Sequence, residues 1–174
     1  SAPQTVAGDR FRSWSNRCNT WLMVEKAPSH VPPGLPGGLI VAAPASGSGK
    51  TVLTLGLLRA LRNQGIRVSS LKVGPDYIDP AYHAAATGRP TANIDLWGMR
   101  PDTIASLVAR AGRDADLIIA EGVMGLFDGA ADGSGSTADV AAFTGWPVLL
   151  IVDVRGQGAS AAAVVRGFRD HRPD

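Results

Sequence analysis

The residues with the clearest chemical potential are Gly47, Ser48, Gly49, Lys50 and Thr51, at the end of the stretch APASGSGKT. They follow a short apolar run and precede an amphipathic helical pattern. Two glycines let the backbone turn its N–H groups toward an anion, and the start of a helix adds partial positive charge. A lysine at this point can reach the outer phosphates of a nucleotide, and a threonine hydroxyl can ligate Mg²⁺. We therefore predict that ATP is bound by Ser46, Gly47, Ser48, Gly49, Lys50 and Thr51.

Two residues of this stretch depart from the usual phosphate-binding loop. Pro44 stands where the loop normally has its first glycine, a position that need not donate a hydrogen bond to phosphate. Ala45 stands where the dimeric ATPases that partition DNA place a second lysine, so alanine disfavours that class. The alternative is an ordinary Gly/Ser turn between a strand and a helix. The order of strand, Gly-x-Gly-Lys-Thr and helix favours the phosphate site.

Ionisable residues follow the other apolar runs. Lys72 lies at the end of the second run, and Asp76 and Asp79 follow it. Glu121 lies at the end of the third run, and Asp128 follows it. In doubly wound sheets, ligands bind at the carboxyl ends of the strands. A carboxylate beside a phosphate loop is suited to hold Mg²⁺ directly or through water. We predict that Thr51 and Glu121 serve as the metal ligands.

Each of these residues also has a structural interpretation. Asp79, before a proline, fits a helix N-cap, and Lys72 fits a solvated charge at a strand end. His83, on a short helix, is more typical of a packing or capping histidine than of a ligand. A purely structural role is harder to justify for Glu121, because a buried carboxylate without a partner is costly.

The pattern of apolar residues predicts the elements that would position this chemistry. Runs of strand length occur at 39–43, 66–73, 116–122 and 147–154. Helical patterns separate them at 51–64, 80–87, 101–110 and 136 to near 145. Short apolar runs that alternate with helices are what a parallel sheet covered on both faces requires. We predict an α/β fold with a doubly wound, mainly parallel sheet.

Composition divides the chain into two parts. Residues 1–37 contain two of the four Trp and the only cysteine, and the stretch HVPPGLPGG at 30–38 cannot continue a helix or a central strand. We predict a poorly ordered N-terminal appendage and Pro/Gly linker over 1–37. The folded domain is predicted over 38–174.

Charge and cysteine content exclude several classes of partner. With 17 basic and 15 acidic residues, the net charge of +2 produces no strong field to attract nucleic acid. Cys18 is alone and cannot form an internal disulfide, which fits a reducing cytoplasm. No apolar run reaches the roughly 18 residues that span a membrane. We expect a cytoplasmic protein without a nucleic-acid or membrane partner.

Five stretches together resemble one family. APASGSGKT, KVGPDYIDPAYH, EGVMGLFDG, GSTADVA and VDVRGQGAS occur in this order, over about residues 38–168. They closely resemble the amino-terminal synthetase domain of the cobyrinic or hydrogenobyrinic acid a,c-diamide synthases of cobalamin biosynthesis. KVGPDYIDP is the most specific of them, since the dethiobiotin synthetases share the phosphate loop without it. The resemblance implies a P-loop NTPase fold of the dethiobiotin synthetase type.

The resemblance also implies an activity and a set of site residues. The activity is ATP- and Mg²⁺-dependent amidation of the a and c carboxylates of a corrin through an acyl phosphate. The residues implied in catalysis are Lys50, Asp76, Asp79, Glu121 and Asp128. Those implied to contact the corrin substrate are Tyr77, Ile78 and Lys72.

The chain departs from that family in its length. Family members continue into a glutaminase domain, where a cysteine nucleophile releases ammonia, whereas this chain stops at Asp174 and Cys18 lacks a glycine-flanked elbow. We expect a synthetase domain that is incomplete at its C-terminus and receives ammonia from a domain that it lacks. A switch ATPase of the partitioning type and an inactive truncated fragment stay open as alternatives. The presence of cobalt in the corrin and a homodimeric state are left open as well.

Overall fold

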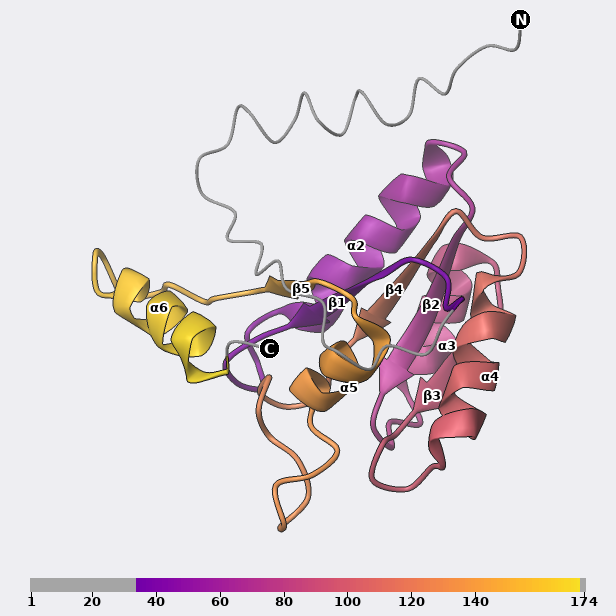
Figure 1. Ribbon diagram of the computed structural model, residues 1–174. Coiled ribbons are helices and arrows are strands. Elements are labelled where there is room, and N and C mark those ends of the chain that lie inside the picture. The colour runs from indigo at the N-terminus through magenta and orange to yellow at the C-terminus, as the bar shows by residue number, and fades with distance from the viewer. Residues whose placement is uncertain (1–33, 173–174) are drawn as a thin grey trace, which may run out of the picture.

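The computed structural model describes residues 34–172, which form one five-stranded parallel sheet in the order β3-β2-β4-β1-β5 (Figure 1). Most of the predicted appendage, residues 1–37, lies outside the described residues. The strands are β1 Gly38–Ala42, β2 Val68–Val73, β3 Ala92–Ile94, β4 Leu117–Glu121 and β5 Val148–Leu150. This arrangement confirms the predicted α/β fold.

Helices cover both faces of the sheet (Figure 1). The covering helices are α2 Lys50–Asn63, α3 Asp79–Thr87, α4 Pro101–Gly112 and α5 Thr137–Thr144, whereas α6 Ala161–His171 stands to one side of the sheet, beyond β5 (Figure 1). Two apolar clusters reflect the two layers, because side chains alternate between the faces of a strand. In β1, Ile40 packs with the cluster that includes Ile104 of α4, and Val41 packs with Leu58 of α2.

The strand order decides which loops become neighbours. Strands β2, β4 and β1 lie side by side and run parallel, so their carboxyl ends meet at one edge of the sheet. The loop after β1 contains Gly47 and Gly49 and leads into α2, whose first two residues are Lys50 and Thr51. The loop after β2 carries Asp76, α3 begins at Asp79, and β4 ends at Glu121. The fold therefore brings the three predicted site segments to one edge.

Some predicted boundaries differ from the structure. The last strand was predicted over 147–154 but ends at Leu150, because its only neighbour among the described residues, β1, ends at the paired residue Ala42. Strand β3 and helix α6 were not predicted, and β3 is too short for an apolar period to show. The N-cap prediction for Asp79 is wrong, since Asp79 is the first residue of α3. A capping box begins α5, in which Ser136 and Asp139 each accept a hydrogen bond from the backbone N–H of the other.

No helix within residues 34–172 is long and apolar enough to cross a membrane.

Candidate functional site

The phosphate loop has an open, backbone-lined shape. Gly47 has φ 78° and Gly49 has φ 86°, values in the left-handed region that glycine adopts without steric cost. A Cβ atom placed on either glycine would have no heavy atom of the described residues within 4 Å. Gly49 is also the N-cap of α2, and no side chain caps the helix there. The N–H groups at the start of α2 are therefore free to bind an anion.

Lys50 is held at the mouth of this loop. Its Nζ atom donates to the carbonyl oxygen of Met124, at 2.6 Å, and to that of Ala45, at 3.2 Å. Burial lowers the pKa of Lys50 from its usual 10.5, although the negative charge of Glu121 acts against this effect. A phosphate oxygen that entered the loop would compete with the two carbonyl oxygens for the same ammonium group.

Four side chains form a charge cluster directly behind the loop: Lys72, Asp79, His83 and Glu121. Lys72 Nζ, at the end of β2, lies 2.6 Å from Asp79 Oδ2 and 3.1 Å from Glu121 Oε1. It is 2% exposed, so the interpretation as a solvated strand-end charge is wrong. Burial alone would lower the pKa of Lys72, but the hydrogen bond that Lys72 donates to Asp79 and the charge of Glu121 outweigh it and raise that pKa.

Thr51 links the charge cluster to the phosphate loop. Its Oγ1 atom donates to Glu121 Oε1 at 2.5 Å and lies 3.4 Å from Asp79 Oδ2. The other Glu121 oxygen, Oε2, lies 2.7 Å from His83 Nε2. Burial would raise the pKa of Glu121, but hydrogen bonds from His83 and Thr51 and the charge of Lys72 lower it below its usual 4.5. Glu121 is therefore an ionised carboxylate inside the protein.

The loop after β2 presents its apolar residues outward. The Asp76 Oδ1 atom accepts hydrogen bonds from the backbone N–H groups of Ile78 and Asp79, so Asp76 provides the acceptor that a helix N-cap would provide. Asn93 Nδ2 donates to the carbonyl oxygens of Gly74 and Asp76 and fixes the start of this loop. Tyr77 at its tip is 91% exposed, and Ile78 is also exposed.

Asp128 lies in the loop after β4, close to the phosphate loop. Its Oδ2 atom accepts from the backbone N–H of Gly125, at 2.8 Å. A Cβ atom on Gly125 would lie 2.6 Å from the Pro44 carbonyl oxygen, so this loop contacts the start of the phosphate loop closely. Asp128 itself is exposed to solvent and makes no direct contact with the charge cluster within the described residues.

The structure thus brings most of the predicted residues together. Six of them lie close together, namely Lys50, Thr51, Lys72, Asp76, Asp79 and Glu121, whereas Tyr77, Ile78 and Asp128 lie around them in exposed loops. The sequence favoured a packing or capping role for His83 and did not indicate its contact with Glu121. The contact of Lys50 with the carbonyl oxygen of Met124 was not predicted either. The spacing of Asp79 and His83 was a usable signal, because residues four apart share one face of a helix.

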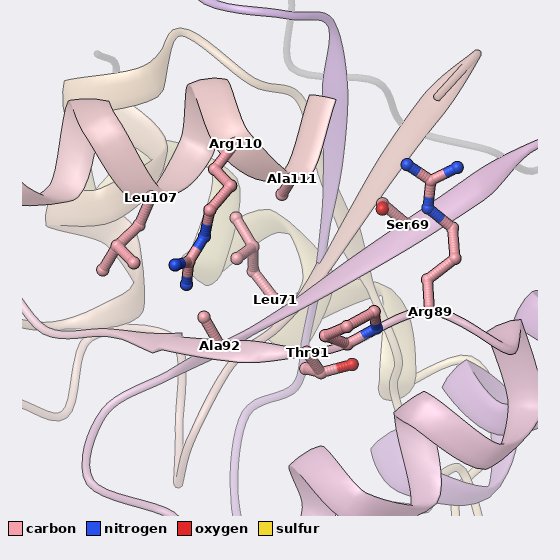
Figure 2. A pocket seen from close by; sticks show the side chains of 9 residues that line it. Ser69, Leu71, Arg89, Thr91, Ala92, Leu107, Arg110 and Ala111 are labelled. Carbon is pink, nitrogen blue, oxygen red and sulfur yellow. The ribbon is translucent and has the colours of Figure 1, made fainter. Parts of the chain in front are cut away.

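A cavity of about 350 Å³ lies away from this edge, between α4 and strands β2 and β3 (Figure 2). Leu71 and Ala92 line it from the strands, Leu107 lines it from α4, and the guanidinium groups of Arg89 and Arg110 stand on either side. None of the predicted site residues lines it. The cavity is therefore separate from the candidate nucleotide site.

The geometry of a phosphate loop backed by buried acidic and basic groups agrees with the family comparison. The family model described as the CobQ/CobB/MinD/ParA nucleotide binding domain matches residues 39–172. The chain belongs to this family. Its members are described as nucleotide-binding domains, and the match spans the phosphate loop and the whole charge cluster.

Curated relatives narrow the resemblance further. The hydrogenobyrinate a,c-diamide synthase of Rhodobacter capsulatus is 57% identical over 140 residues, which are 78% of this chain and 32% of that protein. The enzyme of the same name from Rhizobium meliloti is 53% identical over 137 residues, 79% of this chain and 32% of that protein. The resemblance that the five motifs indicated is confirmed. The chain spans about a third of the length of these relatives.

A solved structure supports the fold alone. The signal recognition particle receptor FtsY from Elizabethkingia anophelis superposes with a TM-score of 0.53 at 18% identity, covering 83% of this chain and 50% of that chain.

Proposed function

We propose that this chain is the ATP-binding part of an enzyme that amidates the a and c side-chain carboxylates of a corrin, either cobyrinate or hydrogenobyrinate, in cobalamin biosynthesis. The observation that carries the proposal is the convergence of Lys72, Asp79 and Glu121 on Thr51 at the phosphate loop. The names of the curated relatives support the corrin as substrate.

The chemistry explains why an amide-forming enzyme needs a phosphate loop. A carboxylate is a poor electrophile, because its leaving group would be oxide. When a carboxylate oxygen attacks the γ-phosphorus of ATP, ADP leaves and an acyl phosphate forms. Ammonia then attacks the acyl carbon, and phosphate leaves to give the amide. Lys50 and Lys72 would stabilise the negative charge on the transferring group through position and electrostatics.

Mg²⁺ fits the oxygen atoms at the front of the charge cluster. No group of three or more His, Cys, Asp or Glu residues able to hold a metal by themselves occurs among the described residues. Mg²⁺ in nucleotide sites is commonly held by one or two carboxylates together with phosphates and water. Thr51 Oγ1 and Glu121 Oε1, already in contact, would be its protein ligands, with Asp79 beside them. When bound, Mg²⁺ would neutralise phosphate charge.

Large apolar side chains stand exposed in the loops at the same edge. Tyr77 and Ile78 follow β2, Trp97 follows β3, and Met124 follows β4. Exposed apolar surface of this kind typically marks a binding site. A corrin is a broad ring with an apolar face and a rim of carboxylates. We infer that the ring lies against these residues while one carboxylate enters toward Lys72, Asp76 and Asp79.

The test is an amidation assay on the purified chain. It contains ATP, Mg²⁺, ammonium and cobyrinic or hydrogenobyrinic acid, and mass spectrometry detects mono- and diamide. Ammonium replaces the nitrogen source that the family resemblance assigns to a glutaminase domain. Lys50→Ala should abolish product, whereas Asp128→Asn should reduce turnover but keep nucleotide binding, because its amide oxygen can still accept from Gly125.

Two results would contradict the proposal. The first is no product under conditions in which a known corrin a,c-diamide synthase works. The second is equal loss of ATP binding in both variants, which would remove the distinction between the phosphate-binding and substrate-side roles. Nucleotide-dependent dimerisation without amidation would favour a switch ATPase instead.

A further inference from the structure

The two oxygens of Glu121 have different partners. Oε1 faces the phosphate loop and accepts from Thr51 and Lys72, whereas Oε2 faces α3 and contacts His83 Nε2 at 2.7 Å. Both Glu121 and His83 are 0% exposed. His83 thus contacts the Glu121 oxygen that faces away from the predicted metal and nucleotide.

The hydrogen-bonding pattern identifies the tautomer of His83. An ionised carboxylate can only accept hydrogen bonds, so Nε2 of His83 must carry the proton. The Nδ1 atom is buried and has no hydrogen-bond partner within residues 34–172. A proton on Nδ1 would create a buried donor without an acceptor, which is costly. Nε2 is therefore the ring nitrogen that donates to Glu121 Oε2.

The position of His83 on α3 connects two parts of the site. Asp79 and His83 are four residues apart and lie on one face of the helix. Asp79 contacts Lys72 of β2, and His83 contacts Glu121 of β4. Helix α3 directly follows the exposed loop that contains Tyr77 and Ile78. Helix α3 is thus connected to that loop and also contacts Glu121, the predicted metal ligand.

We propose that His83 is a positioning residue, which holds Glu121 through Oε2 so that Oε1 stays directed at Thr51 and the phosphate loop. The inference deepens the proposed function and rests on it, since its consequence is tighter binding of ATP in the presence of Mg²⁺. If the Thr51 hydroxyl turns to a metal ion, Oε1 loses a donor but Oε2 keeps the one from His83. Partners that orient metal ligands commonly account for about 10- to 100-fold in metal affinity.

A matched pair of variants separates this role from packing. In His83→Gln, the side-chain amide N–H reaches about as far from the backbone as Nε2 of the histidine does. In His83→Asn, the amide N–H reaches only as far as Nδ1. Calorimetry would measure ATP binding by the full chain with Mg²⁺ and with EDTA. His83→Asn should reduce the enhancement by Mg²⁺ at least about 10-fold. His83→Gln should retain most of it, and binding without Mg²⁺ should be unchanged in both.

Several outcomes would overturn the positioning role. These are normal enhancement by Mg²⁺ in His83→Asn, an equal loss in both variants, an equal loss with and without Mg²⁺, or a wild-type chain that binds ATP without any effect of Mg²⁺. Each would mean that the contact between His83 and Glu121 serves only the packing of α3.

A measurement without nucleotide keeps this inference separate from the proposed function. Long-range ¹H–¹⁵N NMR spectra of histidine-labelled protein report which ring nitrogen carries the proton, and His83→Gln assigns the signal. A proton on Nε2, with a signal that shifts in Glu121→Gln, supports the positioning role. A proton on Nδ1 overturns it. Failure of the wild-type chain to bind ATP while the Nε2 proton is present would count against the proposed function alone.

Discussion

The phosphate loop and the charge cluster behind it share one edge of the sheet but are built in opposite ways. The loop has left-handed glycines at 47 and 49, and a Cβ atom on either would meet no atom of the described residues within 4 Å. The cluster consists of side chains that already satisfy one another, with Lys72 and Glu121 removed from water. The phosphate loop is open to a ligand, whereas the side chains of the charge cluster are already paired with one another.

Because of this difference, we expect the phosphate loop to determine nucleotide affinity and the charge cluster to determine the stability of the fold. Open backbone groups contribute little to the folded state until an anion meets them, so damage to the loop should reduce nucleotide affinity first. Buried charges must keep their partners in the folded state, so damage to the cluster should reduce the free energy of unfolding first. Variants that affect both properties equally would contradict this separation.

The largest effect is expected from Lys72→Met. The change leaves the carboxylates of Asp79 and Glu121 without their shared cation, and Glu121 is fully buried. Loss of one partner from a buried ion pair commonly costs about 3–5 kcal/mol. Urea unfolding followed by circular dichroism should show a loss of this size.

Two controls show whether buried charge is the cause. Arg67→Met removes the cation of an exposed ion pair with Asp116 and should leave the urea midpoint almost unchanged. Lys72→Met combined with Glu121→Gln should recover part of the lost stability, because fewer buried charges lack a partner. A midpoint for Lys72→Met equal to that of Arg67→Met would show that the cluster is not a stability element.

The two regions also differ in how far the sequence predicts them. The phosphate loop is local: Gly47, Gly49, Lys50 and Thr51 lie within five residues, between a predicted strand and a predicted helix. The fold class of the domain also follows from local signals, since apolar runs and helical patterns alternate regularly along the chain. The short edge strand Ala92–Ile94 could not be predicted, because three residues carry no measurable period.

The charge cluster is nonlocal, and this is where the sequence was least informative. Lys72 and Glu121 are 49 residues apart, and they meet only because β2 and β4 are neighbours in the sheet. The helical N-cap motif suggested one role for Asp79, but Lys72 engages its carboxylate instead. His83 looked like a packing residue because its partner, 38 residues further along the chain, is identified only by the fold.

The next effect in size is expected from Gly49→Ala in the phosphate loop. A Cβ atom at this glycine meets no atom of the described residues within 4 Å, and Gly49 lies at the start of α2, where we predict that phosphate binds. Forcing alanine into the left-handed region costs about 1–2 kcal/mol of stability. ATP affinity should fall further, by about 100-fold or about 2.7 kcal/mol, in isothermal calorimetry.

Gly133→Ala provides the matched control for that strain. Gly133 has φ 81°, and its Cβ atom would also meet nothing within 4 Å, but it lies in a turn outside the predicted nucleotide site. The control should therefore lose similar stability and keep its ATP affinity. Equal losses of affinity in both variants would mean that the loop acts through the fold and not through direct contact with phosphate.

The smallest effect concerns acid and the charge cluster. Because the pKa of Glu121 in the folded protein lies below its usual 4.5, the unfolded chain takes up a proton at a higher pH than the folded chain does. The stabilisation is therefore present above about pH 4.5 and is lost as the pH falls through the lower folded-state pKa. Urea unfolding between about pH 6 and about pH 3 should show a steeper loss of stability for wild type than for Glu121→Gln.

The difference between the two slopes of stability against pH gives the contribution of Glu121 separately from that of the other acidic residues. Asp76, Asp116 and Asp139 also have lowered pKa values, but both proteins contain them, so their contribution cancels in the difference. One group can change the slope by at most one proton, or about 1.4 kcal/mol per pH unit. Parallel curves would mean that Glu121 binds its proton equally in both states. In that case, the contacts with His83, Thr51 and Lys72 would do no more than offset the cost of burying this carboxylate.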